Sequence, residues 1–145
     1  MNAPADPDFA VRIRASFGRQ KAMALIGARL ARVAPGTVEI ALPFRDDLTQ
    51  QKGFVHGGII GMIADSAAGY AAYSLMPADC SLVTVEYKMN ILAPATSALT
   101  ARGEVVKPGR TLTVARAEVY AEDGKHVATM QQTLMTLPGT PDRPE

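Results

Sequence analysis

An apolar, Ala-rich segment over residues 59–75 constrains this chain more than any other feature, because Asp65 is its only charged residue. The segment follows His56-Gly57-Gly58 and is stopped by Pro77, since proline cannot continue a helix interior. We therefore predict one long, buried helix from Gly57 to about Leu75. An isolated carboxylate on such a helix is costly unless a partner or a reaction needs it, so Asp65 is a candidate catalytic residue.

Strand-like segments lie on both sides of the predicted helix. Ala22–Val33 and Thr37–Pro43 flank Pro35-Gly36 and predict a hairpin, and a short leading helix is expected from Asp8. Four more strands follow, over residues 82–92, 100–106, 112–122 and 125–137. One long helix can bury its apolar surface inside a single curved antiparallel sheet. The predicted fold class is therefore α+β, with the last four strands forming a meander.

The strand over residues 82–92 alternates between apolar and polar side chains. Its odd-numbered positions from Val83 to Ile91 are apolar, and its even-numbered positions from Thr84 to Asn90 are polar. A half-buried strand turns one of these faces to the core. We therefore expect the odd-numbered residues to face the helix and Thr84 to lie on the polar outer face.

Length and composition fit a single domain over residues 1–145, with frayed tails at about 1–7 and 138–145. Fifteen basic and fourteen acidic residues leave a net charge of +1, and no basic run provides a footprint for nucleic acid. We expect no membrane span, because polar residues interrupt the apolar segment. Cys80 is the only cysteine, which excludes an intrachain disulfide. The first residues lack the pattern of a secretory signal, so a cytoplasmic protein is expected.

The two histidines, His56 and His126, lie far apart in the sequence and lack the spacing of a metal-ligand pair. We expect neither a bound metal nor a cofactor.

The glycine pair at the predicted helix start is a candidate site for a carbonyl oxygen. The backbone amides of Gly57 and Gly58 are unshielded by side chains, and the helix dipole adds positive charge there. A tight turn would also explain the pair. Gly57 and Asp65 are separated by roughly 12 Å of helix rise, so they cannot hold the same carbonyl group within one chain. A shared site would require Asp65 to meet Gly57 of a second chain, which predicts an obligate homodimer. A structural role for Asp65, paired with His56 or Ser66, remains the alternative.

Four segments together resemble the hotdog-fold thioesterases of the phenylacetic-acid-pathway (PaaI-like) type. They are Gln50 to Gly53, His56-Gly57-Gly58, Ala64 to Ala67, and Asn90 to Pro94. The resemblance spans about Pro43 to Pro94. It implies a curved antiparallel sheet around one central helix, and hydrolysis of a medium-chain or arylacyl-CoA to the free acid and coenzyme A. It also implies a homodimer that pairs into a dimer of dimers.

The resemblance also implies roles for individual residues. The Gly57 amide would polarise the thioester carbonyl, and Asp65 of the neighbouring subunit would act as general base or nucleophile. His56 would shape the helix start. Many relatives have Asn where this chain has Gln50, whose amide can still donate to a carbonyl or orient water. Thr84 matches a position where some relatives hold a serine that positions water.

Substrate contacts are expected from Gly58, Thr84, Lys107 and Arg110, the two cations being candidates for the phosphates of coenzyme A. Two alternatives remain open at this point. One is an acyl-thioester dehydratase of the same fold, which would need a histidine and an acid to move a proton. The other is a non-catalytic acyl-CoA-binding module.

Overall fold

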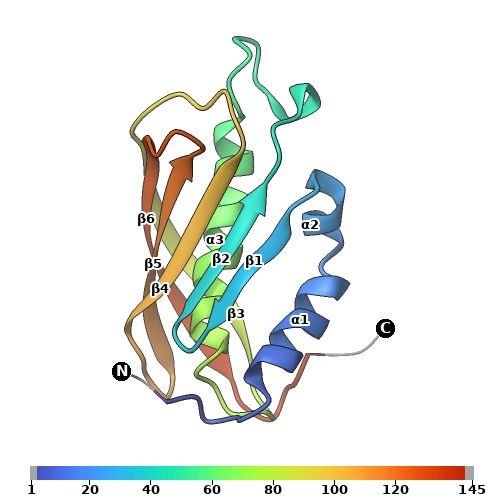
Figure 1. The fold of residues 1–145 in the computed structure, drawn as a ribbon. Coiled ribbons are helices and arrows are strands. Elements are labelled where there is room, and N and C mark those ends of the chain that lie inside the picture. Colours follow the sequence, from blue (N-terminus) through green and yellow to red (C-terminus); the bar gives the residue numbers. More distant parts are fainter. Residues whose placement is uncertain (1–2, 143–145) are drawn as a thin grey trace.

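The computed structural model describes residues 3–142, in which a six-stranded sheet wraps around one long helix, with two short helices beside it (Figure 1). The elements, in chain order, are α1 (Phe9–Arg19), α2 (Lys21–Ile26), β1 (Arg29–Ala34), β2 (Thr37–Leu42), the 3-10 turn η1 (Asp46–Leu48), α3 (Gly57–Tyr73), β3 (Ser81–Ile91), β4 (Leu99–Lys107), β5 (Leu112–Ala121) and β6 (His126–Leu137).

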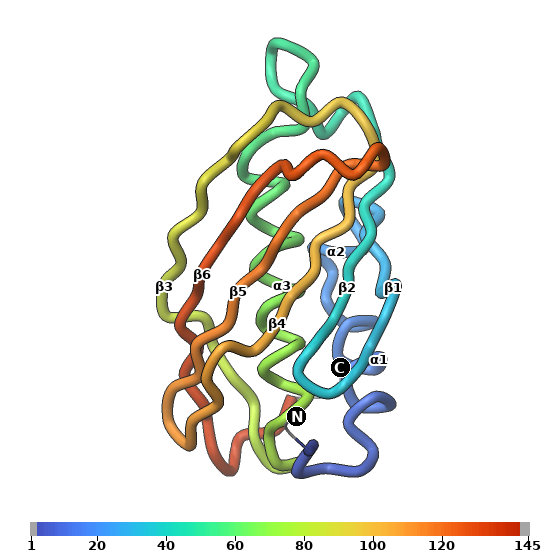
Figure 2. Tube along the Cα trace, turned by 60° about the vertical axis from the view of Figure 1, so that its left-hand side comes forward, coloured from blue at the N-terminus to red at the C-terminus, as the bar shows by residue number. Residues whose placement is uncertain are grey.

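The strand order in the sheet is β1-β2-β4-β5-β6-β3, and every neighbouring pair is antiparallel. The predicted α+β hotdog architecture is confirmed, as is the meander from β4 to β6. The predicted meander is wrong for β3, which pairs with β6 at the far edge rather than with β4. The connection over residues 92–98 passes across the N-terminal end of α3 (Figure 2). This connection is held to the loop before α3 by the Val55 amide, which donates to the Ala95 carbonyl over 2.8 Å.

The helix α3 is buried over most of its length, because small side chains let the sheet come close. Ala64, Ala67, Ala68 and Ala71 have no exposed surface. At Gly103 in β4 an added Cβ would lie 2.1 Å from the Ala67 carbonyl oxygen. Strand β4 therefore passes α3 at a distance that only a glycine permits.

The segment before β1 is a helix where the sequence pattern predicts a strand over Ala22–Val33. Met23 and Ile26 are buried three residues apart, a spacing that places them on one face of a helix but on opposite faces of a strand. Gly27 ends α2 in the left-handed region at φ 76°, and its amide donates to the Ala24 carbonyl. The glycine cap, placed three residues before Leu30, decides for a helix followed by a short strand.

The predicted inner face of β3 is wrong in its first half. A bulge lies between Thr84 and Glu86, and a bulge residue reverses which positions face the core. Before it, Val83 pairs with exposed Met135, whereas Thr84 pairs with fully buried Leu134. Thr84 therefore points toward α3, and the alternation expected from Val83 holds only from Tyr87 onward.

Residues near both ends of the described chain contact α1. Asp6 is buried and lies 3.2 Å from Arg12 Nε. Asp142 accepts a hydrogen bond from Ser16 and lies 3.7 Å from Arg19 Nη2. The outermost tail positions, 1–2 and 143–145, are outside the described residues. No helix within residues 3–142 is long and apolar enough to cross a membrane.

The contact at Gly103 yields a stability prediction. Gly103→Ala should lower the free energy of unfolding by about 3 kcal/mol, because the added methyl meets helix backbone that cannot move aside. Gly18→Ala in α1 is the matched control, since nothing lies within 4 Å of its added Cβ. This control should raise stability by about 0.5 kcal/mol. Urea unfolding followed by circular dichroism measures both, and equal stabilities would contradict the close packing.

Candidate active site

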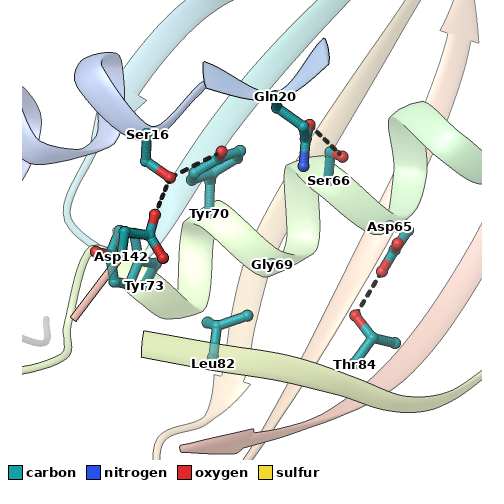
Figure 3. Close-up of a pocket in the computed structure, with 10 residues that line it drawn as sticks. All are labelled: Ser16, Gln20, Asp65, Ser66, Gly69, Tyr70, Tyr73, Leu82, Thr84 and Asp142. Atoms are coloured by element: carbon teal, nitrogen blue, oxygen red, sulfur yellow. Dashed lines mark hydrogen bonds between the residues drawn. The ribbon is translucent and has the colours of Figure 1, made fainter. Parts of the chain in front are cut away.

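Asp65 lies near the middle of α3 and is held by two side chains from the sheet, of which Figure 3 shows Thr84. Its Oδ1 accepts a hydrogen bond of 2.7 Å from Thr84 Oγ1 on β3 and one of 2.8 Å from Gln132 Nε2 on β6. Asp65 Oδ2 has no hydrogen-bond partner among residues 3–142, and Asp65 is only half-buried. One carboxylate oxygen is therefore fixed while the other is available to a ligand.

The partners of Asp65 differ from those considered from the sequence. Ser66 Oγ donates to Gln20 Oε1 over 3.2 Å. The His56 ring is engaged at the helix start. Gln132 was missed, although strand alternation places it on the same face of β6 as the apolar residues Met130 and Leu134. A glutamine in such a row is the sequence signal that would have found it.

Asp65 and Thr84 open into a cavity of about 250 Å³. Tyr70 and Tyr73 line its far end, where Tyr70 Oη and Ser16 Oγ lie 3.1 Å apart (Figure 3). Burial raises the pKa of both tyrosines, so their phenols remain neutral at ordinary pH. No lysine, arginine or histidine lines this cavity within the described chain. The Asp65 carboxylate is therefore held by neutral donors.

The start of α3 carries the second part of the predicted site. His56 is the N-cap, and its Nδ1 accepts a hydrogen bond of 2.8 Å from the Gly58 amide. The proton of a neutral His56 ring consequently lies on Nε2. The Gly57 amide donates to no atom of residues 3–142, as expected for the first residue of a helix. Of the two glycine amides, Gly57 is thus the one free to bind a ligand oxygen.

Gly57 lines a different cavity from Asp65, one of about 330 Å³ that also contains Gln50. Gln50 Oε1 accepts a hydrogen bond from the Lys52 amide, which leaves the Gln50 side-chain NH₂ without a partner in the described chain. Ile91 also lines this cavity, and its Cδ1 would lie 2.9 Å from a Cβ added at Gly57. The structure therefore groups Gln50 with Gly57, and Thr84 with Asp65.

Lys107 and Arg110 lie at the opposite end of α3 from Gly57, in and after the end of β4 (Figure 1). Both are exposed. Arg110 lines a separate cavity of about 610 Å³ with residues after α3 such as Met76 and Cys80. Within one chain, neither cation joins the Gly57 cavity or the Asp65 cavity.

The described residues contain no cluster of three or more His, Cys, Asp or Glu side chains that could hold a metal ion. His126 lies on the sheet surface, 2.6 Å from Glu118 Oε2, and stacks on Tyr120.

The comparison with known proteins establishes the family. A model described as the Thioesterase superfamily matches residues 52–128, a span that contains both Gly57 and Asp65. The chain belongs to the Thioesterase superfamily. It is a thioester hydrolase, and the predicted resemblance to hotdog-fold thioesterases is confirmed.

Similar proteins agree with this assignment. A candidate esterase of Saccharolobus solfataricus is 31% identical over 101 residues, which cover 69% of this chain and 71% of that protein. The crystal structure of a thioesterase family protein from Silicibacter pomeroyi has 51% identity and a TM-score of 0.87, covering 90% of this chain and 99% of that one. The Escherichia coli PaaI protein from the phenylacetic acid degradation operon has 19% identity and a TM-score of 0.87, covering 95% and 99%, which supports the fold.

The cap at His56 can be tested by substitution. His56→Ala should lower the free energy of unfolding by about 1 kcal/mol, because the Gly58 amide loses its acceptor. His56→Asn should keep most of that stability, because asparagine is a favoured N-cap. Urea unfolding of the two variants measures the difference. A His56→Ala variant as stable as the wild type would show that the ring does not stabilise the helix start.

Proposed function

We propose that this thioesterase hydrolyses an acyl-CoA, medium-chain or arylacyl, to the free acid and coenzyme A in active sites shared by two subunits. The observation that carries the proposal is the separation of two incomplete half-sites on one helix. Gly57 offers a free amide in one cavity, and Asp65 offers a free carboxylate oxygen in another. A second copy of the chain supplies the missing half of each.

The direction of β3 relative to α3 supports this arrangement. Thr84, near the start of β3, contacts Asp65, whereas Ile91, at the end of β3, lies beside Gly57. If two β3 strands pair antiparallel, the Thr84 end of one chain meets the Ile91 end of its partner. That pairing brings Asp65 of each subunit toward the partner's half-site, the one built around the glycine amide.

Strand β3 also has the properties of an interface. It is an edge strand, so one row of its backbone groups lacks a neighbouring strand within residues 3–142. Several of its apolar side chains are exposed to solvent: Val83 is 43% exposed, Val85 54% and Tyr87 46%. Exposed apolar residues gathered on a sheet edge favour association. A homodimer would bury them, and two such dimers would form the proposed tetramer.

The chemistry follows from the atoms left free. The Gly57 amide donates to the thioester carbonyl oxygen and stabilises the negative charge that develops there. Asp65 Oδ2 takes a proton from water as the water oxygen attacks the carbonyl carbon, or attacks that carbon itself. The carbon–sulfur bond then breaks, and coenzyme A leaves as a thiolate that acquires a proton; where Asp65 has attacked, water then hydrolyses the resulting acyl–Asp65 anhydride to release the free acid. The free NH₂ of Gln50 lies in the Gly57 cavity, where it can orient the carbonyl or the water.

Four further residues would contact or orient the substrate. Thr84 would keep Asp65 oriented beside the bound acyl group. The Gly58 amide is occupied by His56, so its contribution to binding would come from its missing side chain. Lys107 and Arg110 are exposed cations that suit the phosphates of coenzyme A. Membership of the Thioesterase superfamily favours hydrolysis over the dehydratase and the non-catalytic binder.

The roles of Asp65 and Gly57 can be tested with panels of medium-chain and arylacyl-CoA, following release of free thiol. Asp65→Ala should lower kcat by roughly 10²- to 10⁴-fold. Gly57→Pro should lower it by roughly 10²- to 10³-fold, because proline removes the amide hydrogen. Proline is tolerated at the first position of a helix, and His56 already has the extended conformation, φ −58° and ψ 136°, that proline requires before it.

Gly57→Ala is the matched control, because it adds a side chain and keeps the amide. Its Cβ meets only the end of the Ile91 side chain, which can rotate away. Equal losses in Gly57→Ala and Gly57→Pro would show that bulk, not the amide, matters at this position. Full activity of folded Asp65→Ala would exclude the proposed mechanism, and absence of thiol release by the wild type across the panel would exclude the substrate.

Mixing two inactive variants tests whether the site is shared. Asp65→Ala and Gly57→Pro, mixed and allowed to exchange subunits, should recover about a quarter of the wild-type activity, since half of the dimers regain one of two sites. Asp65→Ala mixed with Asp65→Asn should recover none. Native mass spectrometry measures the fraction of mixed dimers. Mixed dimers without activity, or a fully active monomer, would contradict cross-subunit catalysis.

A further inference from the structure

We infer that Gln132 is a positioning residue, which acts on the reaction through Asp65 and Thr84 without touching the substrate. This inference rests on the proposed function, because it assigns to Asp65 the role described above. The juxtaposition that carries it is a buried amide donating to both members of the Asp65–Thr84 pair.

Gln132 belongs to the buried layer between the sheet and α3. Its side chain has no exposed surface, and Met130 and Leu134 on either side of it are also buried. On the neighbouring strands its partners in register are Ala115 of β5 and Tyr87 of β3. Solvent and substrate therefore reach Asp65 and Thr84, which line the cavity, but not Gln132.

The hydrogen bonds form a closed triangle. Gln132 Nε2 lies 2.8 Å from Asp65 Oδ1 and 3.0 Å from Thr84 Oγ1, and Thr84 Oγ1 lies 2.7 Å from the same Asp65 oxygen. A hydroxyl has one hydrogen to donate. Because the amide of Gln132 can only donate to Thr84, the Thr84 hydrogen is directed to Asp65. Gln132 thus sets the direction of the hydroxyl as well as the position of the carboxylate.

The amide orientation follows from charge. If the side chain were reversed, Gln132 Oε1 would face the Asp65 carboxylate, and two acceptors would repel each other. In the observed orientation Oε1 is buried and has no hydrogen-bond partner within residues 3–142. A buried acceptor without a partner costs about 1–3 kcal/mol. An apolar side chain of similar size would avoid that cost, so packing alone does not explain a glutamine here.

The consequence for the reaction is that only Asp65 Oδ2 is presented to the ligand. With Oδ1 held by two donors from two strands, rotation of the carboxylate is restricted. A reacting group held in one orientation loses less entropy when the transition state forms. Removal of the Gln132 amide should therefore slow the chemical step and leave substrate binding nearly unchanged.

Gln132→Met tests this inference, because methionine has a similar volume and no donor. We expect kcat to fall roughly 10- to 100-fold with KM within about threefold of the wild type. Thermal stability should be equal or higher, because the unpaired acceptor is removed. Gln131→Met is the matched control, since Gln131 precedes it on the same strand, is exposed and lies on the outer face. That control should retain wild-type kcat, KM and stability.

A double-mutant cycle separates positioning from a general structural role. In the Asp65→Ala background, Gln132→Met should cause no further loss of the residual activity, because its effect passes through Asp65. Gln132→Asn provides a second variant in case Gln132→Met does not fold, since its shorter amide cannot reach Asp65 and should lower kcat similarly. Rates are measured with acyl-CoA and with acyl-N-acetylcysteamine thioesters, so that they do not depend on recognition of coenzyme A.

Three results would overturn the inference. They are wild-type kcat in folded Gln132→Met, a loss of kcat matched by an equal loss of stability, or additive losses in the Asp65→Ala background. Wild-type kcat in Gln132→Met together with an inactive Asp65→Ala would remove the inference and leave the proposed function intact. Full activity of Asp65→Ala would instead remove the mechanism on which the inference rests.

Discussion

The close packing of α3 against the sheet is the constraint on which the rest of this structure depends. Gly103 lets β4 approach the backbone of α3 at Ala67, and the alanines of the helix leave room for the sheet to curve around it. Because the helix is enclosed, a side chain in its middle reaches two strands at once. Asp65 meets Thr84 and Gln132 for this reason.

The polar triangle around Asp65 shows how a carboxylate is maintained beside an apolar core. No cation of the described chain pairs with Asp65, so its charge is supported by two neutral donors and by partial exposure to the cavity. The arrangement leaves the Gln132 carbonyl unpaired, which is a local cost in stability. Such costs are common where a residue is retained for what it does. The unpaired Gly57 amide at the helix start is a second polar group of this kind.

Much of the fold could be predicted from local patterns, and the errors have a common physical origin. Residues 57–73 were identifiable as a helix because their composition and the glycine and proline boundaries act locally. The helix α2 was missed because its six residues hold a single buried pair at helical spacing, Met23 and Ile26, which is too short a pattern to establish a period. The place of β3 at the sheet edge depends on the path of residues 92–98. The hydrophobic periodicity of the sequence does not predict that path.

The sequence by itself determined the long helix, the isolated Asp65, the free glycine amide at the helix start and the distance between them, because helical rise follows directly from residue spacing. Only the tertiary structure decided which side chains support Asp65. The bulge after Thr84 reverses the face of the strand, and strand pairing brings Gln132 from the far end of the chain to the same carboxylate. Both depend on contacts between segments distant in sequence, and local propensity carries no information about those contacts.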